Sequence, residues 1–130
     1  MKRTEEREQA FYLIFQSLFS GNPSEAVELF DEAMEQPVSE YAKAIYNGAT
    51  EKADKLDEII SKYLNGWKLN RISKTNLAIL RLAVYEIKYA EDVPPAVAIN
   101  EAVELAKTYS GKEDASFVNG VLGAFVRGNE

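Results

Sequence analysis

The sequence predicts an all-α protein, a compact bundle of about six or seven helices in two packed halves. Apolar residues recur at helical spacing in several segments, and no useful stretch shows the strict alternation of a half-buried strand. Gly and Pro fall between these segments, where helices must end. With 46% hydrophobic and 28% charged residues, the 130-residue chain has the composition of one globular domain, 1–130.

The first expected helix spans about 4–19. Its apolar residues follow the i, i+3, i+4, i+7 spacing of one helix face, at Ala10, Phe11, Ile14, Phe15, Leu18 and Phe19. Thr4 is a candidate N-cap, and Arg7 is expected in the second turn with its side chain facing outward. After a Gly-Asn-Pro break, a short acidic helix is expected over about 24–35.

The longest expected helix begins after an N-cap at Ser39 and runs to about Tyr63. Its apolar residues lie close to one stripe of period 3.6, and Asn65 and Gly66 end it. Gly48 lies inside this helix. It costs about 1 kcal/mol relative to alanine, unless a neighbouring helix needs the room.

Three further helices are expected after a connector at 67–72. The first opens at Ser73 and is apolar on nearly every side, which predicts the central element of the bundle. A Pro-Pro pair at 94–95 restarts the chain for the second, because proline is tolerated in a first helical turn. Glu113 or Asp114 is expected to cap the last helix.

Composition excludes several kinds of function. The chain has no Cys and no His, which rules out disulfides, thiolate zinc sites and imidazole acid–base chemistry. No apolar run is long enough to span a membrane and the start lacks a signal-peptide core, so we expect a cytoplasmic protein that does not associate with membranes. The net charge of −6 argues against nucleic-acid binding by bulk electrostatics.

Polar residues on the core-like helices are interpreted as structural. Arg81 and Glu86 lie on the helix expected to be most buried, so we expect an ion pair or bonds to helix ends for both. Asn100 and Asn119 lie on otherwise apolar helices. We expect their amides to cross-link helices or to cap a neighbouring helix end.

An enzyme is the least favoured interpretation. Glu101 and Glu104 lie three residues apart on one helix, so their carboxylates could share a face and hold a divalent ion. Exposed acids at helical spacing are usually solvated, and Glu104 has Lys107 as an ordinary i, i+3 partner. We therefore expect no catalytic residue, no cofactor and no metal.

The best candidate for nucleic-acid contact is the basic start of the chain, Lys2, Arg3 and Arg7. There, cationic side chains meet the free N–H groups and the positive dipole end of the first helix, a combination that suits phosphates. Unpaired bases would also need aromatic rings on which to stack. The candidates, each of which is also a core candidate, are Phe11, Phe15 and Phe117.

Several sequence blocks together resemble the NusB family of transcription antitermination factors. They are R-E-Q-A-F-Y-L-I-F at 7–15, Trp67 with Arg71, I-L-R-L-A-V-Y-E-I at 79–87, V-P-P-A-V-A-I-N-E-A-V-E-L-A-K at 93–107 and F-V-N-G-V-L at 117–122. The resemblance implies an all-helical factor that binds the boxA element of nascent RNA, usually as a heterodimer with NusE, a small-subunit ribosomal protein. The complex helps RNA polymerase to read through terminators during ribosomal RNA synthesis.

The resemblance also implies the site residues. RNA contacts are expected at the N-terminal basic residues Lys2, Arg3 and Arg7. They are also expected in the neighbourhood of Phe15, Asp114 and Phe117. The face for NusE is expected on the central helix and its neighbours, near Asn76, Arg81 and Tyr85.

The chain departs from the family pattern in two places. Thr4, Glu5 and Glu6 stand where relatives commonly have Arg or Ala, so the cationic patch is thinner and the salt dependence of RNA binding should be shallower. Asn76 and Leu77 replace an acidic residue that is commonly followed by a basic one. A second hypothesis therefore stays open, namely a NusB-fold helical adaptor or homodimer that binds protein partners without strong RNA affinity.

Overall fold

The computed structural model describes residues 1–20 and 37–128. In these ranges the chain forms α-helices, one short 3-10 helix and no strand, which confirms the all-α prediction. The helices are α1 (Arg3–Ser20), α3 (Glu40–Glu51), α4 (Ala53–Ser61), η1 (Leu69–Arg71), α5 (Lys74–Tyr89), α6 (Pro95–Tyr109) and α7 (Lys112–Gly128). The helix expected over 24–35 lies outside the described residues. None of the described helices is long and apolar enough to cross a membrane.

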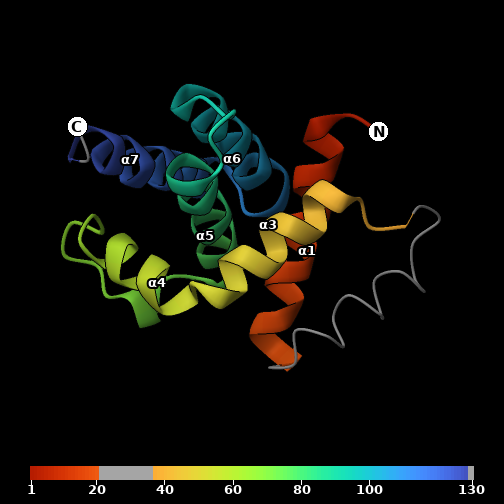
Figure 1. Cartoon of the computed structure of the whole chain (residues 1–130). Coiled ribbons are helices and arrows are strands. Elements are labelled where there is room, and N and C mark those ends of the chain that lie inside the picture. Colours follow the sequence, from red (N-terminus) through yellow and green to blue (C-terminus); the bar gives the residue numbers. More distant parts are fainter. Residues whose placement is uncertain (21–36, 129–130) are drawn as a thin grey trace.

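Helix α5 is the centre of the bundle, as its apolar surface predicts. Each of the other α-helices named above packs against it, and its buried side chains lie on several sides of the helix. Helices α1 and α3 form one side of the molecule and the α6–α7 pair the other, with α5 between them (Figure 1). This arrangement matches the expected two packed halves.

Two of the expected helix starts are confirmed by their hydrogen bonds. The hydroxyl of Ser39 accepts a bond from the Ala42 N–H, and the hydroxyl of Ser73 accepts one from the Asn76 N–H. Such bonds satisfy N–H groups that the first helical turn leaves unpaired.

The expected helix over 39–63 is two helices. Lys52 adopts φ −102 and ψ 18, which ends α3 and begins α4, and the bend lets α3 pack on α1 while α4 packs on α5 and α7. No glycine or proline marks this bend, so the sequence pattern gave no signal of it. The expected cap of the last helix was also wrong, because α7 already begins at Lys112 after Gly111, whose φ is +139°.

Gly48 makes room for a neighbouring helix, as the sequence allowed. A Cβ atom at this position of α3 would overlap the phenol of Tyr85 on α5. The absence of a side chain therefore lets the two helices approach closely.

We expect Gly48→Ala to lower the free energy of unfolding by about 1–3 kcal/mol, because overpacking outweighs the better helix propensity of alanine. The matched control is Gly120→Ala on α7, where an added Cβ meets no heavy atom within 4 Å. That change should be neutral or stabilise by up to about 1 kcal/mol. Urea unfolding measures the change in the free energy of unfolding for both variants. Equal changes would contradict the prediction and show that Tyr85 moves aside without cost.

Candidate nucleic-acid interface

The exposed basic residues at the start of α1 are Lys2 and Arg3. The guanidinium carbon of Arg3 lies 3.7 Å from the centre of the Tyr41 ring on α3, and its Nη1 lies 3.4 Å from Glu6 Oε1. A cation held over a ring keeps a defined position. The positive end of the α1 dipole lies at the same place, so this helix start is suited to an anion.

Arg7 points into the protein, so the expectation that it faces outward is wrong. Arg7 is only 5% exposed. Its Nε donates hydrogen bonds to Glu86 Oε1 at 3.0 Å and to Glu86 Oε2 at 2.8 Å. Glu86 is 1% exposed and also accepts a hydrogen bond from the hydroxyl of Tyr41. A buried carboxylate needs such partners. The expected structural ion pair of Glu86 is therefore confirmed, and Arg7 is its cationic partner.

The hydrogen bonds and charges around this ion pair shift the pKa values of its neighbours and fix the start of α1. Burial by itself lowers the pKa of Arg7, but the hydrogen bond and charge of Glu86 more than offset it and hold that pKa above its ordinary value. Burial, with the bond to Glu86, raises the pKa of Tyr41, so the phenol remains a donor at neutral pH. Thr4, which lies within α1, donates to Glu101 Oε1 at 3.0 Å, and this oxygen lies 3.9 Å from Arg7 Nη1. The start of α1 is thus fixed to α5 and α6.

Asp114 takes part in a second cross-link, at the other end of α5. The buried side chain of Asn76 donates through Nδ2 to Asp114 Oδ1 at 3.1 Å, and its Oδ1 accepts a bond from the Ser110 hydroxyl at 3.1 Å. The first bond joins the start of α5 to the first turn of α7, and the second joins the start of α5 to the C-cap residue of α6. Asp114 therefore orients α7 rather than capping it.

Beside this cross-link lies a pair of aromatic rings, one exposed and one half-buried. Trp67, which is 63% exposed, meets the half-buried Phe117 of α7 edge-on, with ring centres 6.5 Å apart and planes at 73°. The two rings, with the exposed Arg71 and with Asn76 and Asp114, line a hollow of about 310 Å³. Rings, a cation and amide or carboxylate groups are what a splayed-out RNA base requires.

Phe15 lies near the C-terminal end of α1. Its ring stacks on Phe11 at 5.9 Å and meets Phe19 edge-on at 5.0 Å. Phe19 is 62% exposed and lies 4.7 Å from Lys74 Nζ at the start of α5. Phe11, Phe15 and Phe19 thus form a row of rings that runs from the core to the surface, with the half-buried Phe15 in the middle.

The residues expected to face NusE have intramolecular partners. Arg81 binds Asp57 of α4 through two hydrogen bonds of 2.8 and 2.7 Å, which confirms the expected structural ion pair. Tyr85 covers Gly48 and lies 5.1 Å from the ring of Tyr89. Asn76 is buried on the side of α5 that meets α7. The three residues therefore do not share one exposed face, and the expected binding of NusE through them stays a prediction.

The structure thus divides the expected RNA-contact residues into two groups along α5. Lys2 and Arg3 lie near the Glu86 end, whereas Asp114 and Phe117 lie near the Asn76 end. Ten helical residues separate these ends, a rise of roughly 15 Å. An RNA strand of several nucleotides would be needed to reach both.

Two residues of this interface were not among the predicted contacts. Trp67 and Arg71 lie in the connector, a segment of the family pattern whose basic residues Lys68, Arg71 and Lys74 have no acidic neighbour, but neither Trp67 nor Arg71 was predicted to contact RNA. The available signal was a tryptophan in a polar segment with no acidic neighbour, since an exposed tryptophan there has no core to enter.

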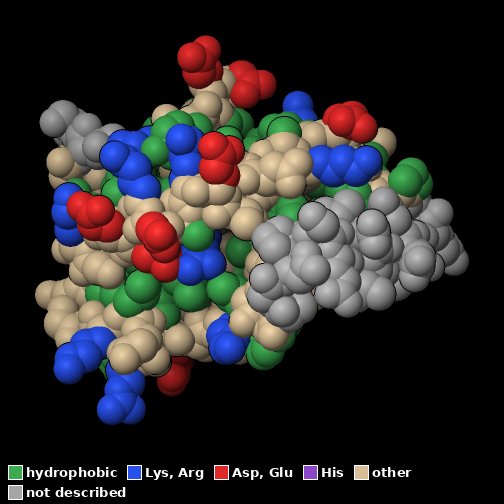
Figure 2. All heavy atoms as spheres, turned by 60° about the horizontal axis from the view of Figure 1, so that its bottom comes forward, with side chains coloured by type: hydrophobic (Ala, Val, Ile, Leu, Met, Phe, Trp, Pro, Cys, Tyr) green, Lys and Arg blue, Asp and Glu red, His purple; other side chains and the backbone are tan. Residues whose placement is uncertain are grey.

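The acidic candidates for catalysis do not form a shared site. Glu101 faces Thr4 and Arg7, whereas Glu104 pairs with Lys107 at the surface. No cluster of three or more acidic residues suited to a metal occurs within residues 1–20 and 37–128. The face shown in Figure 2 has basic and acidic side chains interspersed, with hydrophobic side chains between them. Contacts with an anionic polymer on such a face would be local.

The fold and these side chains define an all-α bundle with two separate candidate contact surfaces for nucleic acid. The model of the NusB family matches residues 4–127. The transcription antitermination protein NusB of Clostridium botulinum (strain Kyoto / Type A2) is 41% identical over 143 residues, covering 97% of this chain and all of the relative. That of Acetivibrio thermocellus is 44% identical over 132 residues, with 98% and 90% covered. The chain belongs to the NusB family.

Solved structures agree with this assignment. NusB from T. maritima superimposes with a TM-score of 0.88 and 34% identity, covering 98% of this chain and 92% of that one. A structure of the antitermination factors NusB and NusE in complex with dsRNA gives a TM-score of 0.85 and 28% identity, with 98% and 99% covered.

Proposed function

We propose that this protein is a transcription antitermination factor that binds boxA-like single-stranded RNA together with NusE and so supports ribosomal RNA transcription. The observation that carries the proposal is the exposed Trp67 against Phe117, beside Arg71 and above a hollow of about 310 Å³. Family membership supports it, as does the similar fold of a NusB that has been solved with NusE and dsRNA.

In this proposal the two surfaces have different tasks. Lys2 and Arg3, with the N-terminal end of α1, hold the phosphate backbone by charge. Trp67 and Phe117 hold an unstacked base, while Arg71 binds a neighbouring phosphate. Asp114 keeps α7, and thereby Phe117, in place through Asn76.

Arg7 has a positioning role in the proposal. Its guanidinium is bound by Glu86 inside the protein, so it holds the start of α1 in register with α5 instead of contacting phosphate. The number of phosphate contacts at this helix start is therefore smaller than the sequence suggested. Salt dependence should be correspondingly shallow.

Replacing Lys2 and Arg3 together with alanine tests the phosphate surface. We expect the affinity for a boxA-like RNA to fall about tenfold, and the slope of log K against log salt to decrease by about 1.4 for two lost contacts. Fluorescence anisotropy over a salt series measures both quantities. Lys55→Ala/Lys88→Ala, which removes two exposed lysines from α4 and α5, should leave them unchanged. An equal loss in this control would mean that binding depends only on net charge.

A further inference from the structure

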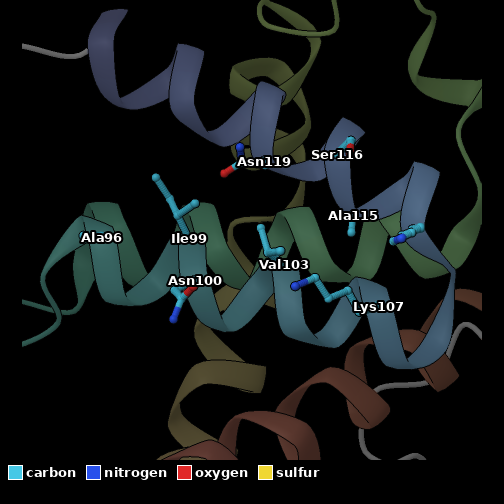
Figure 3. Close-up of a pocket in the computed structure, with 9 residues that line it drawn as sticks. Ala96, Ile99, Asn100, Val103, Lys107, Ala115, Ser116 and Asn119 are labelled. Atoms are coloured by element: carbon cyan, nitrogen blue, oxygen red, sulfur yellow. The ribbon is translucent and has the colours of Figure 1, made fainter.

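A second hollow, of about 570 Å³, lies between α6 and α7. Ile99 and Val103 point from α6 toward α7, and Ser116 and Asn119 lie on the facing side of α7 (Figure 3). The groove shares no lining residue with the 310 Å³ hollow beside Trp67, Arg71 and Phe117. A ligand in this groove and an RNA base in that hollow would therefore contact different residues of α7.

The amides in this groove are free for a ligand. Asn100 and Asn119 were expected to cross-link helices, but both are exposed and neither makes a side-chain hydrogen bond within the described part of the chain. The prediction of a structural role is therefore wrong for both. Two amides beside an aliphatic floor can bond to the backbone or to polar side chains of a partner.

The charge of the groove is positive, in a protein whose net charge is −6. Its charged lining residues are Lys107 and Lys112. Lys107 lies 3.3 Å from Glu104, an exposed pair of small energetic value, and no described carboxylate lies within ion-pair distance of Lys112. Since α7 begins at Lys112, the positive end of its dipole lies at the same end of the groove. Glu113 and Asp114 already lie in this first turn of α7, so the two lysines are what would attract the carboxylates of a partner.

We propose that the α6–α7 groove is a docking site for an acidic amphipathic helix of a protein partner. The apolar side chains of that helix contact Ile99 and Val103, and its carboxylates pair with Lys107 and Lys112. The groove has the size of a typical binding pocket, and a helix in a groove is a common mode of recognition. No described lining residue is aromatic. A nucleic-acid strand would find no ring for stacking, which favours a peptide over RNA.

Titration of the isotopically labelled full chain with a synthetic helix tests this proposal by NMR. The probe is a 14-residue peptide with leucine at i, i+3, i+4 and i+7 and glutamate at most other positions. We expect chemical-shift changes confined to residues 96–119 and a Kd below about 100 µM. A peptide of the same composition with scrambled leucines should bind at least tenfold more weakly.

A pair of charge-matched variants isolates the groove. Lys107→Glu/Lys112→Glu should weaken the acidic peptide at least tenfold, whereas Lys55→Glu/Lys88→Glu, with the same change of net charge, should not. The lysine variants of the groove should leave binding of boxA-like RNA unchanged, because neither lysine lines the hollow beside Trp67, Arg71 and Phe117. Three results would overturn the proposal: no peptide binding, shift changes centred outside the groove, or stronger perturbation of the groove by a single-stranded oligouridylate than by the acidic peptide.

Discussion

Replacing Glu86 with alanine is expected to lower the free energy of unfolding by about 3–5 kcal/mol, the largest effect foreseen for a single substitution in this protein. The change leaves the buried guanidinium of Arg7 without its hydrogen-bonded carboxylate, with only Glu101 at 3.9 Å among the described residues, and leaves the Tyr41 phenol without its acceptor. Urea unfolding monitored by circular dichroism measures the loss. Glu104→Ala provides the control, because Glu104 is exposed and its one ion pair among the described residues is with Lys107, so its loss should change stability by less than about 0.5 kcal/mol.

A compensated variant separates stability from RNA binding. Arg7→Met/Tyr41→Phe/Glu86→Leu replaces the buried polar groups by apolar ones, which often restores or exceeds the original stability. If Arg7 only positions α1, this variant should bind boxA-like RNA within about threefold of the parent. A stable triple variant that loses RNA binding tenfold or more would show that Arg7 contacts RNA.

Replacing Trp67 with alanine is expected to weaken RNA binding by about 1–3 kcal/mol, the loss associated with one stacked base. The ring is exposed and makes its aromatic contact with Phe117 alone among the described residues, so the fold should tolerate its removal. Anisotropy titrations with boxA-like RNA give the affinity, and thermal unfolding checks the fold.

The conservative variant Trp67→Phe distinguishes stacking from a structural effect. A phenyl ring retains a stacking face, so this variant should recover most of the affinity lost in Trp67→Ala. If both variants bind RNA as well as the parent, the hollow beside Phe117 is not the base site. The phosphate surface at Lys2 and Arg3 would then act without it.

Much of the helical framework could be predicted because its signals are local. Serine caps at Ser39 and Ser73 act within one helical turn, and the apolar surface of α5 reports directly on how many neighbours it has. Gly48 was also interpretable, since a glycine inside a helix implies either a cost or a close neighbour. The bend at Lys52 had no such signal, because packing of α4 on α5 and α7 decides it.

The direction of Arg7 illustrates why the site was harder to predict than the fold. Its position in α1 allowed an outward or an inward side chain, and the deciding partner, Glu86, lies 79 residues further along the chain. The sequence showed that Glu86 needed a partner but not which residue provided it. Trp67 was not predicted as a contact because the sequence does not show that its ring is exposed. That exposure depends on how the neighbouring elements η1 and α7 pack.

The measurement that tests the proposed function most directly is fluorescence anisotropy of a labelled boxA-like RNA against a scrambled RNA, with and without the cognate NusE, at fixed salt. We expect tighter binding of the boxA-like RNA by at least tenfold, further strengthened by NusE and reduced by Trp67→Ala. Equal binding of both RNAs in the presence of NusE would contradict RNA recognition by this protein.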